Sequence, residues 1–569
     1  MDGLEHYRSG RGRIPDRMLK WFLYGEGLDN LKMAEVPVPE IGPDDLLVRQ
    51  DANGLCFSDT KVLALGNNHP RMQGRDLAHD PATLGHEVAI TVVQVGENRT
   101  SRFQIGDRFI VQADVFYQGV SMAYGYAISG GLAEYSVIPT PMMDGDEGCY
   151  LLPIARDTGY AAAALVEPWA CVVGAYNQGH RDAPKPGGFL LILAGDGAAA
   201  RDLSGILDAV GPSARVIIVG VEADRTAAGR EAVRIRSVED WDHLTAANGV
   251  TGFDDIVVLG HVAAEEVERA SAKLANHGIV NLSGAEPFPR KLTLDIGRIH
   301  YNWHHYIGSA SGRIMDAYNE PRGADLKPGG RAWFIGAGGP MGQMHVQRAV
   351  MHREAPALVL CTDIDGERLA TVVDRFSGIA EKRGITLIAL NPKEFTPEAF
   401  DERLRQIAEG GFDDIVSLVP VPALIEHATQ FLSDGAWCNI FAGVARGTMA
   451  QIDANAIRDQ GVRYIGSSGS SIADMKETLD MVERGELSTN ASLAAIGGME
   501  AAHEGLAGVK AGRFPGKTLI FPLIKGMPLV ALHDLANLYP TVHAKLEDGK
   551  FWTREAEEEL FRLTIARDA

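Results

Sequence analysis

An internal repeat limits, more than any other feature, how this chain of 569 residues can fold. Three short segments recur in the same order, namely Lys-Pro-Gly-Gly at 185–188 and 327–330, Gly-Phe-Asp-Asp-Ile-Val at 252–257 and 411–416, and Tyr-Ile-Gly-Ser at 306–309 and 464–467. The first pair is offset by 142 residues and the others by 159 and 158, so we expect an insertion of about 17 residues in the second copy, around Glu381 to Arg403. A tandem duplication of one α/β domain is the simplest explanation.

Both copies show the pattern of a nucleotide-binding fold. Short apolar strands alternate with helical stretches, as in a doubly wound parallel sheet. In each copy a strand runs into a glycine-rich turn, at Gly195-Asp196-Gly197 in the first copy and from Gly336 in the second. Such a turn lets the backbone approach a pyrophosphate at the N-terminus of the next helix. We therefore predict two tandem Rossmann-like domains.

The second copy carries the remaining signature of a dinucleotide site. Asp363 ends the following strand, where an acidic residue about 20 positions after the turn bonds the adenosine ribose, and Asp365 lies just behind it. The charge of Asp363 would repel a 2′-phosphate, so we expect NAD rather than NADP. The predicted cofactor-binding residues are Gly336, Gly338, Gly339, Pro340, Met341, Gly342, Asp363 and Asp365.

The first copy departs from this signature. Gly220 stands at the corresponding strand end, and Asp196 puts a carboxylate inside the turn, where it would face phosphate oxygens of like charge. We interpret this copy as degenerate, with an architectural use such as taking the place of a partner subunit's domain or forming an oligomer interface. Glu222 could reach a ribose from a shifted register, so a functional first site stays open.

Upstream of the repeat, the chain contains the donor atoms of a zinc site. Cys56, His86 and Glu167 offer a thiolate, an imidazole and a carboxylate. Zinc takes these ligands in tetrahedral sites, and three protein ligands leave one position for water or substrate. Each residue taken singly favours a structural role, but their order, with Gly54 and Gly85 beside them, favours a catalytic metal site.

With the segments Gly-Leu-Cys-Phe-Ser-Asp, Gly-His-Glu and Val-Glu-Pro at 54–59, 85–87 and 166–168, the chain resembles the zinc-dependent medium-chain alcohol and polyol dehydrogenases, most closely their sorbose-1-phosphate reductase and sorbitol-dehydrogenase-like branch. The resemblance implies a GroES-like catalytic β-barrel. It also implies that Glu87 is a carboxylate beside the zinc that can exchange into the ligand set, and that Ser58 relays the proton. The predicted metal ligands are Cys56, His86, Glu87 and Glu167, and the catalytic residues are Ser58, Cys56, His86 and Glu87.

One zinc ion is expected. Many relatives of this kind hold a structural zinc in a lobe with four closely spaced cysteines, whereas here the stretch from Asp107 to Tyr150 contains only Cys149. The resemblance therefore implies no structural zinc. The cysteines other than Cys56 have no Cys-x-x-Cys partner and are interpreted as structural thiols, with Cys171 kept as an outside candidate ligand because it is close to Glu167.

The order of the segments indicates the domain organisation. We expect residues 1–186 to form the GroES-like zinc domain, completed by 485–522, with 187–313 as the first Rossmann-like copy, 327–484 as the NAD-binding copy, and 523–569 as a C-terminal extension. The extension has no counterpart that we recognise. Thr553 is the expected N-cap of a helix in it, whose acidic face we expect to be solvated.

Composition excludes several classes of partner. A formal net charge of −21 makes nucleic acid or an anionic membrane a poor partner, because both demand clustered Lys and Arg. Apolar runs stay short of membrane-spanning length, the N-terminal stretch lacks a signal-peptide core, and five cysteines without a framework fit a reducing compartment. We expect a cytoplasmic homo-oligomer, dimer or tetramer, whose partner is a small molecule.

These features predict an enzyme that transfers a hydride between NAD(H) and a secondary alcohol or ketone of a polyol, sugar or sugar phosphate. Two alternatives stay open. An enzyme that retains NAD could use transient oxidation for epimerisation, elimination or carbon–carbon cleavage, and tightly held NAD would point to it. A non-catalytic scaffold on a dehydrogenase fold is the other, and failure to bind zinc would favour it.

Overall fold

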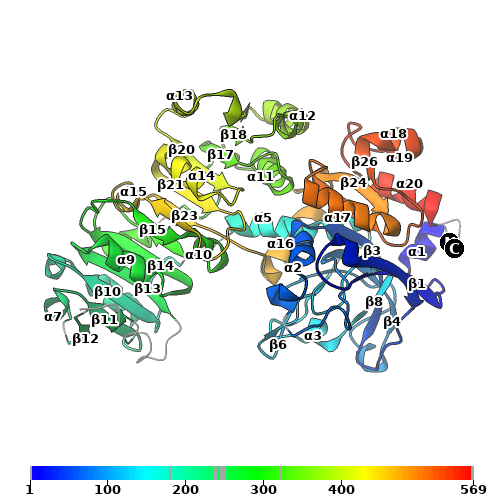
Figure 1. The fold of residues 1–569 in the computed structure, drawn as a ribbon, viewed down its shortest axis with the longest axis horizontal. Helices are drawn as coiled ribbons and strands as arrows, with labels where there is room; N and C mark the ends of the chain where they lie inside the picture. Colours follow the sequence, from blue (N-terminus) through cyan, green and yellow to red (C-terminus); the bar gives the residue numbers. More distant parts are fainter. Residues whose placement is uncertain are drawn as a thin grey trace. The chain divides into compact units, whose positions relative to one another are not determined.

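A computed structural model describes residues 3–72, 74–177, 181–227, 229–234, 240–241, 243, 252–319 and 322–565 (Figure 1). The chain separates into two compact units, the first made of Met1–Val173 with Ser470–Ala569 and the second of Gly174–Gly469. Both divisions fall earlier in the chain than the boundaries expected at 186 and 485. The extension 523–569 belongs to the first unit.

The first unit is built around an antiparallel-rich sheet. Among the described residues this sheet has eight strands, in the order β26-β24-β25-β3-β4-β5-β9, with β8 paired to β3. Its strands are β3 (Leu46–Leu55), β4 (Glu87–Val95), β5 (Arg108–Val111), β8 (Tyr135–Ile138), β9 (Leu151–Pro153), β24 (Leu493–Gly498), β25 (Lys517–Phe521) and β26 (Val530–Ala531). All residues of β3 are buried, because this strand pairs with β4, β8 and β25. A separate hairpin joins β1 (Arg17–Leu23) to β2 (Leu31–Pro37).

Short helices cover this sheet and connect its strands. They include α1 (Gly3–Arg8), α2 (Phe57–Leu65), α4 (Tyr160–Ala164), α5 (Val166–Tyr176), α16 (Ile472–Glu483), α17 (Ala502–Ala511) and α20 (Arg554–Thr564). One apolar core joins residues from both ends of the chain, since Leu55 and Val62 pack in the same cluster as Met499, Leu506 and Ile520. Residues after the second unit in sequence therefore share the apolar core of the first unit.

The second unit holds the two copies of the repeat in one sheet. Among the described residues this sheet has twelve strands, in the order β12-β11-β10-β13-β14-β16-β23-β21-β20-β17-β18-β19. The first copy supplies β10 (Phe189–Ala194), β11 (Arg215–Val219), β12 (Glu231–Val233), β13 (Phe253–Gly260), β14 (Leu274–Ala285) and β16 (His305–Ile307), and the second β17 (Arg331–Ile335), β18 (Leu358–Thr362), β19 (Thr386–Leu390), β20 (Phe412–Ser417), β21 (Leu432–Ile440) and β23 (Arg463–Ile465). Neighbouring strands within each copy are parallel, as in a doubly wound fold.

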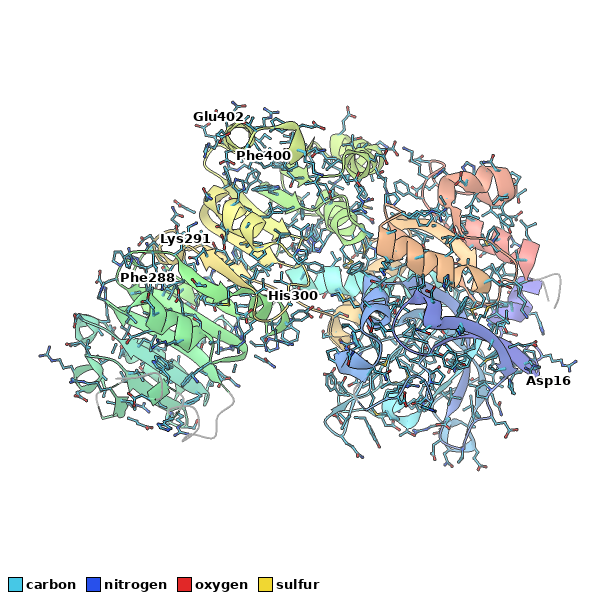
Figure 2. The ribbon with its side chains drawn as sticks, in the orientation of Figure 1. Asp16, Phe288, Lys291, His300, Phe400 and Glu402 are labelled. Atoms are coloured by element: carbon cyan, nitrogen blue, oxygen red, sulfur yellow. The ribbon has the colours of Figure 1, made fainter. Side chains whose placement is uncertain are left out.

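Helices flank the strands of both copies. They are α6 (Ser204–Val210), α7 (Ala223–Thr226), α9 (Ala264–Ser271) and α10 (Ile296–Tyr301) in the first copy, and α11 (Pro340–Met351), α12 (Gly366–Lys382), α13 (Pro397–Ile407), α14 (Pro422–Ala428) and α15 (Ala454–Gln460) in the second. β19 and α13 occupy the stretch where we expected the insertion, and Phe400 on α13 is labelled in Figure 2.

The two copies meet through equivalent residues. β16 and β23 pair antiparallel at Tyr306 and Tyr464, which are the first residues of the two Tyr-Ile-Gly-Ser segments. In a second two-stranded sheet, β15 (Leu292–Asp295) and β22 (Met449–Ile452) pair antiparallel, with Thr293 opposite Gln451. Tyr306 with Tyr464 and Thr293 with Gln451 both have the 158-residue spacing of that repeat, so in these two pairs each residue faces its own counterpart. Such self-matching is the rule for a two-fold symmetric subunit interface.

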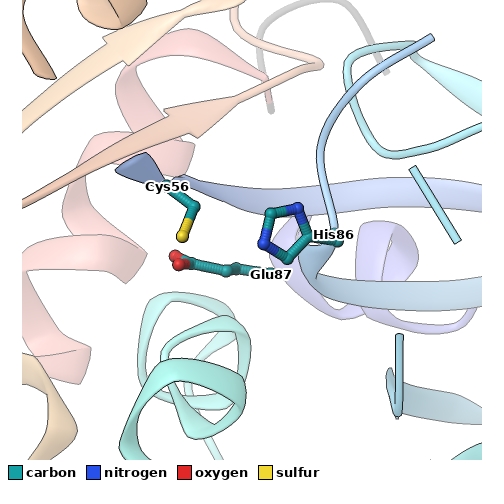
Figure 3. A group of neighbouring side chains, drawn as sticks. All are labelled: Cys56, His86 and Glu87. Carbon is teal, nitrogen blue, oxygen red and sulfur yellow. The ribbon is translucent and has the colours of Figure 1, made fainter. Parts of the chain in front are cut away.

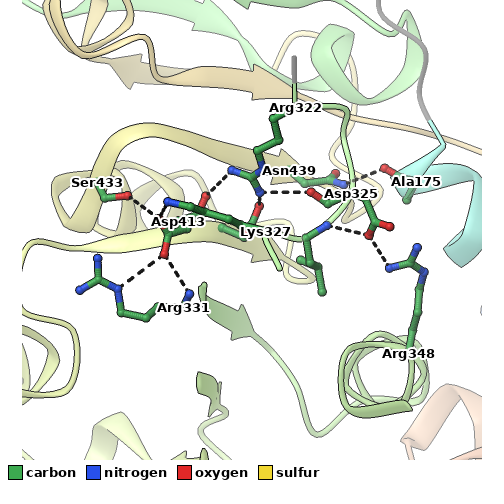
Figure 4. A network of polar contacts seen from close by, with 11 residues as sticks. Ala175, Arg322, Asp325, Lys327, Arg331, Arg348, Asp413, Ser433 and Asn439 are labelled. Carbon is green, nitrogen blue, oxygen red and sulfur yellow. Dashed lines mark hydrogen bonds and ion pairs between the residues drawn. The ribbon is translucent and has the colours of Figure 1, made fainter. Parts of the chain in front are cut away.

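The repeated segments are structural, as the second copy shows (Figure 4). Lys327 donates from Nζ to Asp413 at 2.6 Å and from its backbone N–H to Asp414 at 2.9 Å. The backbone N–H of Arg331 donates to the other oxygen of Asp413 at 2.9 Å, and Arg322 pairs with Asp414. The Asp-Asp segment therefore holds the Lys-Pro-Gly-Gly turn against the start of β20.

The first copy repeats this network. Lys185 donates from Nζ to Asp254 at 2.7 Å and from its backbone N–H to Asp255 at 2.9 Å. Arg181 pairs with Asp255 at 2.7 Å, and the backbone N–H of Phe189 donates to Asp254 at 2.9 Å. The two copies share this network although their glycine-rich turns differ. The shared structural role explains why these segments recur in the sequence.

The polar-aromatic stretch His300–His305 lies at the junction of the copies. Nδ1 of His300 (Figure 2) lies 3.2 Å from the carbonyl oxygen of Ile440, and Arg446 donates to Asn302 at 2.9 Å. Both contacts join the first copy to the second, so this stretch helps hold the two copies together.

The C-terminal extension 523–569 packs onto the first unit. Thr553 is the N-cap of α20, as predicted, and accepts a backbone bond at 3.0 Å. The expectation of a solvated acidic face is wrong, because Glu557 is buried and accepts two backbone N–H groups at the start of α4. Glu558 pairs with Arg8 on α1 at 2.8 Å.

Among the helices that the structure describes, none has the length and apolar character needed to cross a membrane.

Candidate active site

Cys56, His86 and Glu87 lie together in the first unit (Figure 3). One donor atom from each lies within 4.8 Å of the others, and in the described part of the chain no other three such residues come this close. His86 and Glu87 are buried, whereas Cys56 is half-buried. The structure therefore brings three of the four predicted metal ligands to one point.

The local backbone explains this arrangement. β3 ends immediately before Cys56, which is the N-cap of α2, and the backbone N–H of Cys56 donates to Oδ2 of Asp59 at 3.0 Å. Glu87 begins β4 and pairs with Gly54 of β3 in the antiparallel register. A Cβ on Gly54 would collide with Oε2 of Glu87, so glycine leaves the space that the carboxylate occupies.

Asp59 and Ser58 orient the imidazole of His86. Nδ1 of His86 lies 3.2 Å from Oδ1 of Asp59, and Nε2 lies 3.2 Å from Oγ of Ser58. Burial opposes the charged form, yet Tyr126 and Asp59 together raise the pKa of His86 well above its ordinary value. Because Asp59 faces Nδ1, Nε2 is the nitrogen left to bind a metal.

Glu87 forms a buried ion pair that the sequence did not reveal. Nζ of Lys517 lies 2.5 Å from Oε1 of Glu87 and donates to the carbonyl of Leu55 at 3.2 Å. The two side chains are 5% and 0% exposed. Burial alone would lower the pKa of Lys517. Glu87 and Cys56 raise this pKa by more than burial lowers it, so the lysine stays charged. Oε2 of Glu87 has no hydrogen-bond partner among the described residues.

Glu167, the fourth predicted ligand, is the second residue of α5 and is half-buried. Burial raises its pKa to about 7, and His86, Glu87 and Lys517 all act on it electrostatically. Its carboxylate therefore lies near the cluster, although it is outside the group of three whose donor atoms lie within 4.8 Å. One turn later, burial raises the pKa of Cys171 well above its ordinary value, with Glu167 adding to the effect.

The donor set fits zinc. A thiolate, an imidazole nitrogen and a carboxylate oxygen are zinc's usual ligands, and a spacing within 4.8 Å suits a single ion between them. A buried carboxylate oxygen without a partner costs free energy unless a cation satisfies it, and Oε2 of Glu87 is such an atom with respect to the residues that the structure describes. Glu87, rather than Glu167, completes the set of donor atoms that lie within 4.8 Å of one another.

The second copy has the predicted turn at a helix start. β17 runs into Gly336, whose φ of 82° is left-handed, and α11 begins at Pro340 with Gly339 as its N-cap. Met341 lies in the first turn of the helix, and a Cβ on Gly342 would collide with the carbonyl oxygen of Gly336. The turn therefore packs closely under the helix and leaves its first N–H groups for an anion.

Asp363 follows β18 and lies at this turn. Its Oδ2 accepts from the backbone N–H of Gly338 at 3.0 Å. Asp365 has a structural role as the N-cap of α12. It accepts hydrogen bonds from the backbone N–H groups of Glu367 and Arg368 at 3.0 and 3.2 Å. Asp363 therefore remains the acidic residue nearest the turn.

An apolar cavity of about 350 Å³ adjoins Asp363 and Gly336. It opens where β17, β18 and β20 end, and the insertion supplies part of its wall through Pro392, Phe395 and Phe400. Ligands of doubly wound sheets bind at the carboxyl ends of the strands. A cavity of this volume with aromatic and aliphatic walls suits a flat base.

The first copy lacks a helix start at its turn. The turn leads to a 3-10 helix, Ala198–Ala200, and α6 begins only at Ser204. The backbone of Asp196 forms an isolated β-bridge with the backbone of His261. A Cβ on Gly195 would collide with the carbonyl of His261. The amide groups that would bind a pyrophosphate are thus arranged differently from those of the second copy.

Sequence reasoning missed Asp59 and Lys517 as parts of the cluster. Asp59 had a local signal, because it stands three positions after Cys56 where a capping residue belongs. Lys517 had none, since it reaches Glu87 from a strand 430 residues later.

Comparisons with known proteins agree with this fold. Residues 42–143 match the family described as the alcohol dehydrogenase GroES-like domain. The chain is 31% identical over 322 residues to mannitol-1-phosphate 5-dehydrogenase of Aliivibrio fischeri, covering 51% of this chain and 74% of that protein. It is 29% identical over 326 residues to L-sorbose 1-phosphate reductase of Klebsiella pneumoniae, covering 52% of this chain and 75% of that protein.

The fold also matches a solved structure. 2R,3R-butanediol dehydrogenase of Bacillus subtilis superposes with a TM-score of 0.50 at 15% identity, covering 89% of this chain and 99% of that chain. The likeness confirms the predicted combination of a GroES-like domain with Rossmann-like domains. Together with the relative that is 31% identical over most of its own length, it shows that the chain is an oxidoreductase that belongs to the medium-chain alcohol and polyol dehydrogenase superfamily.

Proposed function

We propose that this enzyme transfers a hydride between NAD(H) and a secondary alcohol or ketone of a polyol, sugar or sugar phosphate, with one zinc ion in its active site. The observation that carries the proposal is the convergence of Cys56, His86 and Glu87, where Oε2 of Glu87 is buried and has no hydrogen-bond partner among the described residues. The names of the two relatives, which act on a phosphorylated polyol and a phosphorylated ketose, support the substrate class.

Cys56, His86 and Glu87 would hold the zinc, and Glu167 would exchange with Glu87. When bound there, zinc would supply a Lewis acid that lowers the pKa of a substrate hydroxyl, and NAD would supply the hydride acceptor. Asp59 keeps Nε2 of His86 directed at the site, and Lys517 fixes one oxygen of Glu87.

Ser58 is the proposed proton relay. Its Oγ lies 3.2 Å from Nε2 of His86, and the residue is half-buried, so one side faces the cluster while the other reaches solvent. A hydroxyl both donates and accepts, so Ser58 can take the proton of the substrate hydroxyl and pass one outward in the same step.

Arg71 and Asp114 are candidates for substrate recognition. They pair at 2.6 Å with side chains 40% and 36% exposed. Arg71 lies 5.0 Å over the ring of Tyr126, and that ring lies 5.7 Å from His86. A carboxylate and a guanidinium suit adjacent hydroxyls, and a guanidinium also binds phosphate through two bonds. We propose that Arg71 decides between free and phosphorylated substrates.

The test is NADH absorbance after mixing zinc-loaded enzyme and NAD with a panel of polyols and their phosphates. Many turnovers of NADH would support the proposal, and Arg71→Lys should then change the preference between a polyol and its phosphate. Reduction that stops at one equivalent while substrate is consumed would favour the enzyme that retains NAD. A protein that binds neither zinc nor NAD would contradict the proposal.

A further inference from the structure

Helix α20 of the C-terminal extension contacts both elements that bring distant residues to the metal cluster. One element is α4 with the adjoining α5, which carries Glu167, and the other is β25, which begins with Lys517. These contacts come from Glu557 and Phe561, one turn apart on the buried face of α20.

Glu557 closes the N-terminal end of α4. Its two carboxylate oxygens accept from the backbone N–H groups of Tyr160 and Ala161, each at 2.7 Å, and its residue exposure is 2%. The N-cap of α4 is Gly159, which has no side chain to make these bonds. A carboxylate that accepts N–H groups at the positive end of a helix is favoured by charge and geometry. Only Leu165 separates α4 from α5, so the bonds of Glu557 to the start of α4 also set the position where α5 begins, and with it the position of Glu167.

Phe561 connects the same helix to β25. Its ring stacks on Tyr160 at 5.8 Å and 22°, and meets Phe521 edge to face at 5.3 Å and 88°. Phe521 is the last residue of β25, whose first residue, Lys517, holds Glu87. A single ring therefore packs against the helix that leads to Glu167 and the strand that leads to Lys517.

We propose that α20 is a positioning element of the active site, in which Glu557 and Phe561 hold Glu167 and the Lys517–Glu87 pair at their places around the metal. The inference rests on the proposed zinc site. It assigns a use to an extension that the sequence left without one. Residues that hydrogen-bond directly to metal ligands typically change metal affinity by about 10- to 100-fold when altered. Glu557 and Phe561 act one contact further away, so we expect a change at the lower end of that range, about tenfold.

The test compares Glu557→Gln with Glu555→Gln in the full-length enzyme. Glu555 stands on the same helix but is exposed. In Glu557→Gln an amide N–H₂ would face one of the two backbone donors, so we expect zinc affinity, measured against a chromogenic chelator, to fall about tenfold. The absorption bands of the cobalt-substituted enzyme should also change. Glu555→Gln should match the parent enzyme in both measurements.

Phe561→Leu gives an independent variant, because it keeps an apolar side chain and removes the ring contacts. We expect lower zinc affinity and altered cobalt bands here also, with circular dichroism confirming the fold. If the parent binds zinc and both variants keep its affinity and its cobalt spectrum, even with a lower melting temperature, α20 only stabilises the fold and the inference is overturned. If the parent itself binds no zinc at Cys56, the proposed metal site fails first.

Discussion

Lys517→Met probes the buried ion pair beside the metal cluster. The substitution keeps the length of the side chain and removes the ammonium that lies 2.5 Å from Oε1 of Glu87. Because Glu87 is fully buried and its Oε2 has no hydrogen-bond partner in the described part of the chain, it would be left as an uncompensated buried charge. Removing one partner of such a pair costs about 3–5 kcal/mol. We therefore expect the metal-free first unit to melt on the order of 10 °C lower.

The assay is thermal unfolding of the metal-free and zinc-loaded proteins, followed by circular dichroism. Zinc would supply positive charge to Glu87, so the loss should be clearly smaller in the zinc-loaded variant. Glu87→Gln combined with Lys517→Met should recover part of the stability, because the unpaired charge is gone. Lys510→Met, at an exposed lysine of α17, is the matched control and should change stability by less than about 1 kcal/mol.

A loss below about 1 kcal/mol in the metal-free Lys517→Met variant would refute this reasoning, because Glu87 would then tolerate burial without its partner. An equal loss with and without zinc would contradict the placement of Glu87 among the metal ligands.

Three further predictions follow from the same sites. Cys56→Ser should abolish turnover and weaken zinc binding while NAD affinity, measured by titration, stays unchanged; normal turnover would remove Cys56 from the ligand set. Asp363→Ala should weaken NAD binding, measured by calorimetry, by about 10- to 100-fold, which is the contribution of a hydrogen bond to a charged group. Asp196→Ala in the first copy should leave NAD affinity unaltered. The reverse pattern would assign the cofactor site to the first copy. Burial raises the pKa of Glu167 to about 7 in the metal-free protein, so zinc must displace a proton below that pH and zinc affinity should rise from pH 6 to pH 8. Glu167→Gln should make that rise less steep, because the raised pKa of His86 still contributes to it, and an unchanged slope would exclude Glu167 as a contributor.

The fold was predictable where its signals are local or repeated. The duplication indicated two Rossmann-like domains because the same Lys and Asp residues lock the same turn in each copy, as Lys185 with Asp254 and Lys327 with Asp413 do. The joining of the copies into one sheet was beyond sequence reasoning. It depends on the backbone pair Tyr306 with Tyr464, on a short two-stranded sheet and on one apolar core that contains residues of both copies, and these contacts leave no periodic pattern.

The same distinction holds for the site. Cys56, His86 and Glu87 were predictable as a group because they flank the ends of two neighbouring strands, within motifs of a few residues. Lys517 and Glu557 were not, since they reach their partners across 430 and 397 residues, and a lone Lys or Glu in a sequence carries no sign of burial.

The junction of the two copies has a thermodynamic consequence. A two-fold interface between separate subunits must offset the translational and rotational entropy of association, and it weakens on dilution. Here both halves belong to one chain, so the segment between β16 and β17 keeps them at a high effective concentration. A junction with so few backbone pairs can therefore persist at any protein concentration, and activity per chain should not fall with dilution through loss of this contact.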